Sequence, residues 1–182
     1  MKICKPFKNA TKASITQGFH SEHLANDFAG KYGEFLVSPF NGKVVNIIGA
    51  ETLDGSQDLL RNGCGIKIQS AEDPSMSISY WHTLQIFPVK KGDVVLMGQP
   101  VAQLGNTGFV LANGKYVEID IRTLPPYPGT HVHITYGKVK EDGTYENLDY
   151  SSFIDWDIPI KYDLITAIMA TLQSIKNILK IS

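Results

Sequence analysis

The 182-residue chain has no excess of charge of either sign, because 17 lysine and arginine residues nearly match 18 aspartate and glutamate residues and leave a formal net charge of -1. It contains no basic block, so nothing in the charge pattern indicates a nucleic-acid partner. No apolar run reaches the ~18 residues of a membrane-spanning helix. Residues 1–6 also lack the apolar run of a secretory signal. We therefore expect a protein that binds no nucleic acid and that either is not exported by the signal-peptide route or is a mature, trimmed form.

The chain contains only two cysteines, Cys4 and Cys64. They form no CxxC pair, which argues against a zinc site built from cysteines, and they could be two free thiols or one bridge. The His-Glu-x-x-His helix of many zinc proteases is absent as well. A zinc site in this chain therefore has to be assembled from fragments that lie far apart in the sequence.

Hydrophobic residues make up 43% of the chain, enough for one well-packed domain and an extension. Apolar or alternating segments, separated by turns rich in glycine, proline and asparagine, recur over 35–48, 64–69, 76–82, 89–95, 99–108 and 116–122. Asn41-Gly42 is a strong turn signal and predicts that two strands meet there. The fold class predicted for residues 1–150 is all-β, an antiparallel β-sandwich or open barrel of the duplicated hybrid motif type.

Residues 151–182 form a C-terminal extension of a different character. From Asp163 on, apolar residues recur at the three-to-four spacing of an amphipathic helix, at Leu164, Ile165, Ile168, Met169, Leu172, Ile175, Ile178 and Leu179. Asp163 is a suitable N-cap, and Lys176 and Lys180 lie near the end where the helix dipole favours cations. So apolar a helix should not stay free in water. We expect it to pack on its own domain, to dock on a protein partner or to lie on a membrane.

Two of the five histidines, His131 and His133, stand two residues apart in an apolar, β-branched run. Residues two apart in a strand project from the same face, so both imidazoles should lie side by side. Such a pair suits a metal ligand beside a proton-transfer group. A zinc hydrolase needs about three protein ligands, an open position and a group that takes a proton from water. His23 with Asp27, and His82 at the end of a strand, can complete this requirement.

Five fragments resemble, in order, the motifs of the lysostaphin-type (LytM-like) zinc metalloendopeptidases, peptidoglycan hydrolases that cut cell-wall peptide cross-links. The family pattern runs His-x-Gly-x-Asp, Tyr-x-His-Leu, Gly-Asp-x-Val-x-x-Gly-Gln, Gly-x-Thr-Gly and His-x-His. The matching positions here are 23–27, 80–84, 92–99, 105–108 and 131–133. A single His-x-His is a weak signal, whereas all five fragments in order are specific. The resemblance covers residues 15 to 137.

The resemblance implies one Zn²⁺ held by His23, Asp27 and His133, with zinc-bound water as the nucleophile that hydrolyses the peptide bond. His131 would act as general base and then protonate the leaving amine, and His82 would donate a hydrogen bond to the oxyanion or steady the water. The implied substrate is a peptidoglycan peptide, cut at the cell wall in an extracellular, periplasmic or phage-associated setting. Further residues expected at the substrate groove are His20, Asn26, Tyr80 and Thr107.

Three features depart from the family pattern. Ala25 replaces the usual glycine after the first ligand, and Ile134-Thr135 stands where an aromatic and an acidic residue commonly follow the His-x-His. Residues 109–130 are inserted before the His-x-His and include the strand-like 116–122 and a proline-rich loop. We expect this insert to form a hairpin at the groove wall, where it would affect substrate preference and leave the zinc chemistry unchanged.

Other interpretations of the same residues stay open at this point. The main alternative is a non-catalytic binding or scaffold module on the same fold, such as a virion or secretion-apparatus component. A biotinyl or lipoyl carrier is a third reading, because 39–45 and 91–100 look like its half-repeats, but residues 105–108 offer no lysine where the carrier needs one. The histidines could also be ordinary surface residues. The sequence leaves open which peptide bond is cut, whether the role is in a host or a phage, and the oligomeric state.

Overall fold

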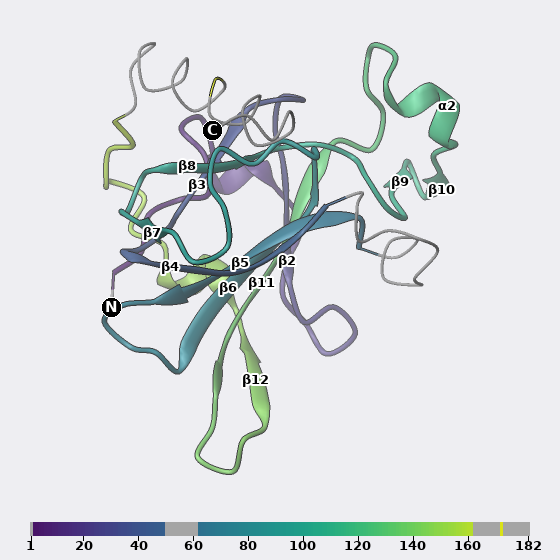
Figure 1. Ribbon diagram of the computed structural model, residues 1–182. Helices are drawn as coiled ribbons and strands as arrows, with labels where there is room; N and C mark the ends of the chain where they lie inside the picture. The colour runs from purple at the N-terminus through teal and green to yellow at the C-terminus, as the bar shows by residue number, and fades with distance from the viewer. Residues whose placement is uncertain (1, 50–61, 162–171, 173–182) are drawn as a thin grey trace.

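One long antiparallel sheet organises the computed structural model, which describes residues 2–49, 62–161 and 172 (Figure 1). Its strands, in spatial order, are β1 (Ile15–Gln17), β2 (Asn26–Ala29), β11 (His131–Val139), β6 (Met76–Thr83), β5 (Cys64–Ser70), β4 (Gly42–Ile48) and β7 (Val94–Val95), with β12 (Tyr145–Leu148) paired to β11. Two ribbons join β3 (Phe35–Val37) with β8 (Pro100–Gln103) and β9 (Leu111–Ala112) with β10 (Lys115–Tyr116). The helical elements within 2–49 and 62–161 are η1 (Lys12–Ser14), α2 (Ile119–Arg122) and η3 (Tyr150–Phe153). The predicted antiparallel, mostly β fold is therefore confirmed.

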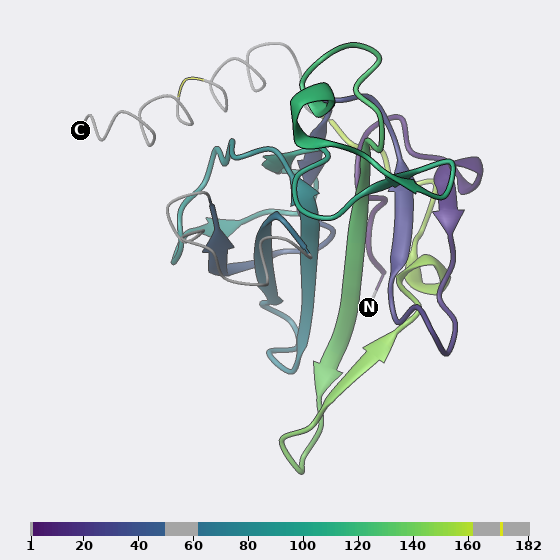
Figure 2. The same ribbon diagram turned by 90° about the vertical axis from the view of Figure 1, so that its right-hand side faces the viewer.

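The central strand β11 shows how the sheet separates the core from the opposite face. Val132, Ile134 and Tyr136 are buried and alternate with His131 and His133 along the strand. The buried residues belong to a core cluster to which β3 and β8 also contribute, so the β3–β8 ribbon packs on this face. Because successive side chains of a strand point to opposite faces, both histidines lie on the face away from the core. Figure 2 shows β11 and β6 running side by side through the body of the molecule.

Two long excursions of the chain lie at opposite ends of β11. Residues 109–130, with β9, β10 and α2, lie at its N-terminal end, and the β11–β12 hairpin extends from the body at the other end (Figures 1 and 2). The insert therefore enters the sheet directly at His131, next to the candidate site.

The turn predicted at Asn41-Gly42 differs from the one observed. The flanking strands exist but do not pair with each other, since β3 pairs with β8 while β4 pairs with β5 and β7. Gly42 is the first residue of β4, where a side chain would collide with the backbone of Gln69. These two residues therefore connect two sheets and do not close a hairpin.

Residues 116–122 contain a helical turn, and the edge strand predicted from their alternation is wrong. β10 ends at Tyr116 and α2 begins at Ile119. Ile119 and Ile121 are 68% and 45% exposed, whereas Arg122 is buried. The apolar positions therefore do not mark a buried strand face. The segment is held instead by the arginine side chain, which binds backbone carbonyl groups that the alternation does not reveal.

The N-terminal residues and residues 150–160 pack together on the core. Ile3 forms a parallel bridge with Ile154, and the Tyr150 hydroxyl donates a 2.8 Å hydrogen bond to the Cys4 carbonyl. The amphipathic helix predicted from Asp163 on lies outside the described residues, apart from position 172. Among the residues that are described, no helix has the length and apolarity to cross a membrane. The duplicated hybrid motif stays a prediction.

Cys4 and Cys64 are free thiols, and both are buried. Burial raises the pKa of Cys4 to about 11 and also raises the pKa of Cys64. Because the thiolate is the reactive form, a pKa of about 11 in place of the usual 9.0 lowers the reactive fraction of Cys4 at pH 8 about 100-fold. We expect Ellman's reagent at pH 8 to titrate both thiols only after denaturation in guanidinium. Rapid reaction of either thiol in the folded chain would contradict these buried positions.

Candidate metal centre and catalytic site

The pairing of β2 with β11 brings Asp27 and His133 together. They are direct cross-strand partners, and His133 Nδ1 lies 2.9 Å from Asp27 Oδ1 in a hydrogen bond. His131 projects from the same face of β11, and its Nε2 lies 4.0 Å from Asp27 Oδ2. The prediction that the two imidazoles share one face is therefore confirmed, and the face is the one that carries the carboxylate.

His23 reaches the same carboxylate from the loop before β2. Its Nε2 lies 3.4 Å from Asp27 Oδ1, and its Nδ1 lies 3.2 Å from the Gly18 carbonyl. Reciprocal 3.0 Å backbone hydrogen bonds between His20 and His23 tighten the loop. A carbonyl oxygen accepts only from a protonated ring nitrogen, so His23 Nδ1 carries a proton, and in the neutral ring the lone pair is on Nε2. That lone pair is the atom directed at Asp27.

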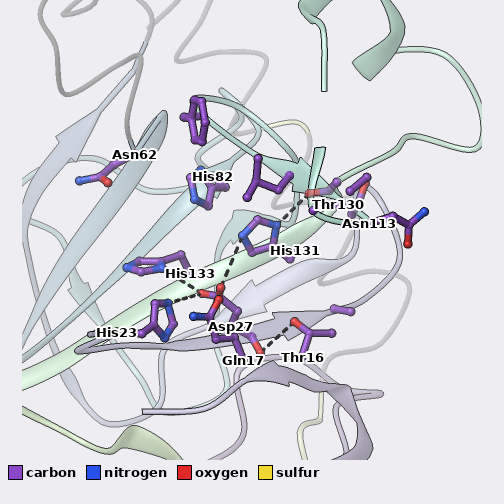
Figure 3. A pocket seen from close by; sticks show the side chains of 16 residues that line it. Thr16, Gln17, His23, Asp27, Asn62, His82, Asn113, Thr130, His131 and His133 are labelled. Atoms are coloured by element: carbon purple, nitrogen blue, oxygen red, sulfur yellow. Dashed lines mark hydrogen bonds and ion pairs between the residues drawn. The ribbon is translucent and has the colours of Figure 1, made fainter. Parts of the chain in front are cut away.

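Three side chains from these elements, His23, Asp27 and His133, form a compact set of candidate metal ligands (Figure 3). Each offers one ligand atom, and these atoms all lie within 4.8 Å of one another. With bonds of about 2.0–2.1 Å, ligand atoms around a tetrahedral zinc ion are roughly 3.3–3.4 Å apart. The 3.4 Å between His23 Nε2 and Asp27 Oδ1 agrees with that separation. Imidazole nitrogen and carboxylate oxygen are also donors that zinc accepts, so these residues fit a zinc ion.

His82 reaches the site through an irregularity in β6. The β5–β6 ladder shifts register beside His82, which is left without a ladder partner. Its φ of 61° lies in the left-handed region that is rare outside glycine. A β-bulge of this kind re-aims a side chain, and here the His82 ring centre lies 4.7 Å from that of His131. With regular alternation, His82 would have followed Tyr80 onto the core face.

Backbone carbonyls set the tautomers of His82 and His131. His82 Nδ1 lies 2.8 Å from the Thr107 carbonyl, and His131 Nδ1 lies 2.8 Å from the Gly129 carbonyl. Since each carbonyl can only accept, each Nδ1 carries a proton, and in the neutral form of each ring the lone pair is on Nε2. Burial is the main cause that lowers the pKa of His82 to about 3, and the charge of the neighbouring His131, when that ring is protonated, is the second cause. His82 is therefore neutral at neutral pH, with Nε2 as a hydrogen-bond acceptor.

Asp27 stays ionised although it is buried. Burial by itself raises the pKa of its carboxyl group, but the hydrogen bond from His133 and the charges that His133, His131 and His23 carry when protonated outweigh this effect and hold the pKa below the usual 3.8. A carboxylate must be deprotonated to bind a metal ion, so the histidines keep Asp27 in the required form at neutral pH.

A cavity of about 760 Å³ opens onto all five side chains (Figure 3). Its other lining residues come mainly from β1, the end of the loop before β5 and the insert: Thr16, Gln17, Ala29, Asn62, Phe109, Leu111, Ala112, Asn113, Gly114, Gly129 and Thr130. Phe109 stacks on Tyr116 with ring centres 5.0 Å apart, which joins the two sides of the insert. The predicted hairpin at the groove wall is therefore confirmed, although β9 and β10 form it and residues 117–122 lie outside it.

His20 and Asn26, both predicted at the groove, lie outside this lining. His20 is exposed at the edge, with its ring centre 5.7 Å from that of His23. Asn26 is buried, and its side-chain amide donates a 3.0 Å hydrogen bond to Asp149. Adjacent residues of a strand point to opposite faces, so Asn26 cannot share the groove of Asp27. The prediction is corrected for Asn26.

Tyr80 and Thr107 also lie outside the lining, for different reasons. Tyr80 is fully buried in the core, where its hydroxyl donates a 2.8 Å hydrogen bond to a carbonyl of β3. Thr107 lies behind His82, and its hydroxyl donates to the Thr83 carbonyl over 2.8 Å and accepts from the Cys64 N–H over 2.9 Å. The groove assignment is therefore corrected for both residues, because one packs in the core and the other holds the His82 ring through its carbonyl.

The sequence interpretation missed five polar lining residues, Thr16, Gln17, Asn62, Asn113 and Thr130. One of them had a readable signal. Asn113-Gly114 between short apolar runs predicts a tight hairpin, and the two residues have the positive φ values of 52° and 74° that such a turn requires. Asn62 is tied to the site by its carbonyl, which accepts a 2.9 Å hydrogen bond from the His82 N–H. A hydrogen bond between two backbone groups cannot be predicted from a pattern of side chains.

Known proteins resemble this chain in sequence and in fold. The sequence profile of peptidase family M23 matches residues 21–141, which include all five site residues. No curated protein sequence matches the chain. Among solved structures, a zinc-containing peptidase from Vibrio cholerae is 21% identical with a TM-score of 0.54, over 90% of this chain and 41% of that one. LytU is 24% identical with a TM-score of 0.52, over 85% and 84% of the two chains.

Csd3 of Helicobacter pylori is 17% identical with a TM-score of 0.56, over 100% of this chain and 42% of that one. The chain thus spans less than half the length of the Vibrio and Helicobacter structures. At these identities the likenesses show a common fold.

Proposed function

We propose that this chain, which belongs to peptidase family M23, is a zinc-dependent endopeptidase that hydrolyses peptide bonds in peptidoglycan cross-links. The observation that carries the proposal is the convergence of three histidines on the Asp27 carboxylate, beside a cavity and next to a fourth histidine. A non-catalytic module on the same fold has no need for all five of these side chains around one cavity.

In this proposal His23, Asp27 and His133 hold one Zn²⁺. When bound, the ion would act as a Lewis acid and lower the pKa of a water molecule in its open position. Asp27 contributes a negative charge that its histidine neighbours keep ionised, and the Gly18 carbonyl orients the His23 ring so that Nε2 faces the carboxylate. A hydrogen bond from the ring nitrogen that does not face the metal to a backbone carbonyl commonly fixes the tautomer of a metal-binding histidine.

His131 is the proposed general base. Its Nδ1–H is bound to the Gly129 carbonyl, so Nε2 is free to take a proton and later to give it to the leaving amine. His82 has the same arrangement with the Thr107 carbonyl and is neutral. Its Nε2 can therefore accept a hydrogen bond and steady the attacking water. Of the two roles expected for His82, this tautomer supports that one over donation to the oxyanion.

The proposal extends to the organisation of the chain and its surroundings. Residues 1–150 would form the endopeptidase domain, and residues 151–182 a C-terminal extension whose first ten residues pack back on that domain. The substrate is a peptidoglycan peptide, so the protein would act at the cell wall. A protein or membrane contact through the predicted helix of the extension belongs to the same proposal.

Removal of the metal tests the proposal directly. We expect the purified full chain to bind one equivalent of Zn²⁺ and to cleave cross-linked muropeptides. Treatment with 1,10-phenanthroline should reduce the cleavage rate at least about 100-fold, because the ion supplies the nucleophile, and one equivalent of Zn²⁺ should restore it. Zinc binding would be followed by mass spectrometry and cleavage by chromatography.

Two results would contradict this expectation. Cleavage that continues undiminished in the metal-free chain would remove zinc from the reaction. Tight zinc binding without cleavage of any cross-linked muropeptide would instead support the non-catalytic binding module.

A further inference from the structure

The insert contains a buried arginine whose side-chain hydrogen bonds all go to backbone carbonyls. The Arg122 Nε and Nη2 donate to the Val117 carbonyl over 2.8 and 2.7 Å, and Nη1 donates to the carbonyls of Asn106, over 3.3 Å, and Gly108. The guanidinium also lies over the Tyr116 ring, 5.2 Å from its centre. No ion pair joins Arg122 to a carboxylate within residues 2–49 and 62–161.

These contacts clamp a short turn. The carbonyls of Asn106 and Gly108 flank Thr107 on both sides, and one nitrogen of Arg122 holds both of them. The tie is reciprocal, because the Asn106 side-chain amide donates to the Arg122 carbonyl over 3.0 Å and to the Pro128 carbonyl over 2.9 Å. A planar guanidinium has five N–H donors in a fixed fork and can bind the Val117 carbonyl and the two flanking carbonyls together, whereas an ammonium has only three donors on a single nitrogen and lacks this fork.

The clamped turn contacts both histidines that are not candidate ligands. The Thr107 carbonyl accepts from His82 Nδ1 over 2.8 Å, and the Gly105 carbonyl accepts from the His131 N–H over 3.2 Å. A shift of this turn would therefore change the orientation of the His82 ring first, because that ring depends on one carbonyl of the turn.

We propose that Arg122 is a positioning residue, which holds the turn 105–108 so that the Thr107 carbonyl fixes the orientation and tautomer of His82. The insert then has a second role besides forming a wall of the cavity, since its Arg122 holds the turn whose Thr107 carbonyl binds the His82 ring. The positioning itself rests on the contacts above, and its consequence for catalysis rests on the proposed function.

The test is a spectroscopic one that needs no activity. In ¹⁵N-labelled full chain at pH 7, the His82 Nδ1–H bound to Thr107 should give a proton signal that exchanges slowly with water. In Arg122→Met we expect that exchange to become about tenfold faster, which corresponds to the loss of one hydrogen bond. Lys115→Met removes an exposed cation from the same insert and should leave the signal unchanged. Circular dichroism and the melting temperature report whether each variant is folded.

Arg122→Lys keeps the charge and decides the question if the methionine variant does not fold. A lysine has one nitrogen in place of the three of the guanidinium and cannot keep the Val117 carbonyl and both flanking carbonyls in the same geometry, so the His82 exchange rate should still rise several-fold. A His82 signal like that of the wild type in either folded variant would overturn the proposal, as would an equal change in Lys115→Met.

The catalytic consequence is measured separately on muropeptides. Arg122→Lys should lower kcat about tenfold while KM stays within about twofold, because the reacting groups are displaced and the cavity is not. A raised KM with unchanged kcat would instead assign Arg122 to substrate binding and overturn the proposal. If the wild-type chain cleaves nothing, the proposed function fails, and the His82 signal still decides the role of Arg122.

Discussion

Replacing Asp27 by alanine is expected to lower the affinity for Zn²⁺ at least about 100-fold, because even the loss of a group that only supports a ligand costs 10–100-fold. Asp27 is the one carboxylate that His23, His131 and His133 all approach, at 3.4, 4.0 and 2.9 Å. Without it, the imidazoles of His23 and His133 remain as candidate ligands and the negative charge of Asp27 is lost. Cleavage of muropeptides should fall to background in the same variant. Zinc affinity would be measured by competition with a chromophoric chelator.

Two controls separate the causes of that loss. Asp27→Asn keeps the shape of the side chain and removes the charge, so zinc affinity should fall in this variant as well. Asp142→Ala removes a carboxylate from the exposed tip between β11 and β12 and should change neither zinc binding nor cleavage. Unaltered zinc affinity in Asp27→Ala would exclude this carboxylate as a ligand and, with it, the proposed metal centre.

The second large effect is expected at His131. His131→Ala should keep one bound Zn²⁺ while the cleavage rate falls about 10²–10⁴-fold, the range that a positioned acid–base group contributes. The side chain has a free Nε2 on the side of Asp27, and its Nδ1–H is held by the Gly129 carbonyl. Removing it takes away the proton acceptor and leaves His23, Asp27 and His133 in place. Bound zinc and the initial rate of muropeptide cleavage are the two measurements.

His20→Ala is the matched control, because it removes an exposed imidazole at the edge of the site that lies outside the cavity lining. Its cleavage rate should stay within about twofold of the wild type, as for most exposed substitutions. If His131→Ala cleaved at the rate of His20→Ala, His131 would have no part in the mechanism. If His131→Ala also lost its zinc, the residue would belong with the ligands and not with the base.

Short-range patterns carried much of the correct prediction. Alternation along residues 131–139 placed His131 and His133 on one face and the apolar residues between them on the other, as the burial of β11 confirms. The strands over 64–70 and 76–83 were readable for the same reason. Period-two alternation of apolar residues marks the face of a strand that packs on the core, and each of these strands has such a face, although the other side of β6 is buried as well.

The same patterns failed where long-range contacts override them. A regular strand would place His82 on the same face as Tyr80, but a bulge with a left-handed residue turns it to the site. Asn26 lies next to a ligand in sequence and on the other side of the sheet in space. The alternation of 116–122 predicts a strand, yet the guanidinium of Arg122 finds its acceptors in the turn 105–108 and in Val117.

The sequence by itself determined the chemical types and the local facing of the site residues: four imidazoles and a carboxylate, two of the imidazoles on one strand face, in an antiparallel β domain. Only the tertiary structure decided that β2 lies beside β11 in the register that joins Asp27 to His133, and that the carbonyls of Gly18, Thr107 and Gly129 set the tautomers. The physical reason is that side-chain alternation is encoded residue by residue. Every residue carries the same carbonyl group, so which carbonyl meets which ring depends on how the whole chain packs.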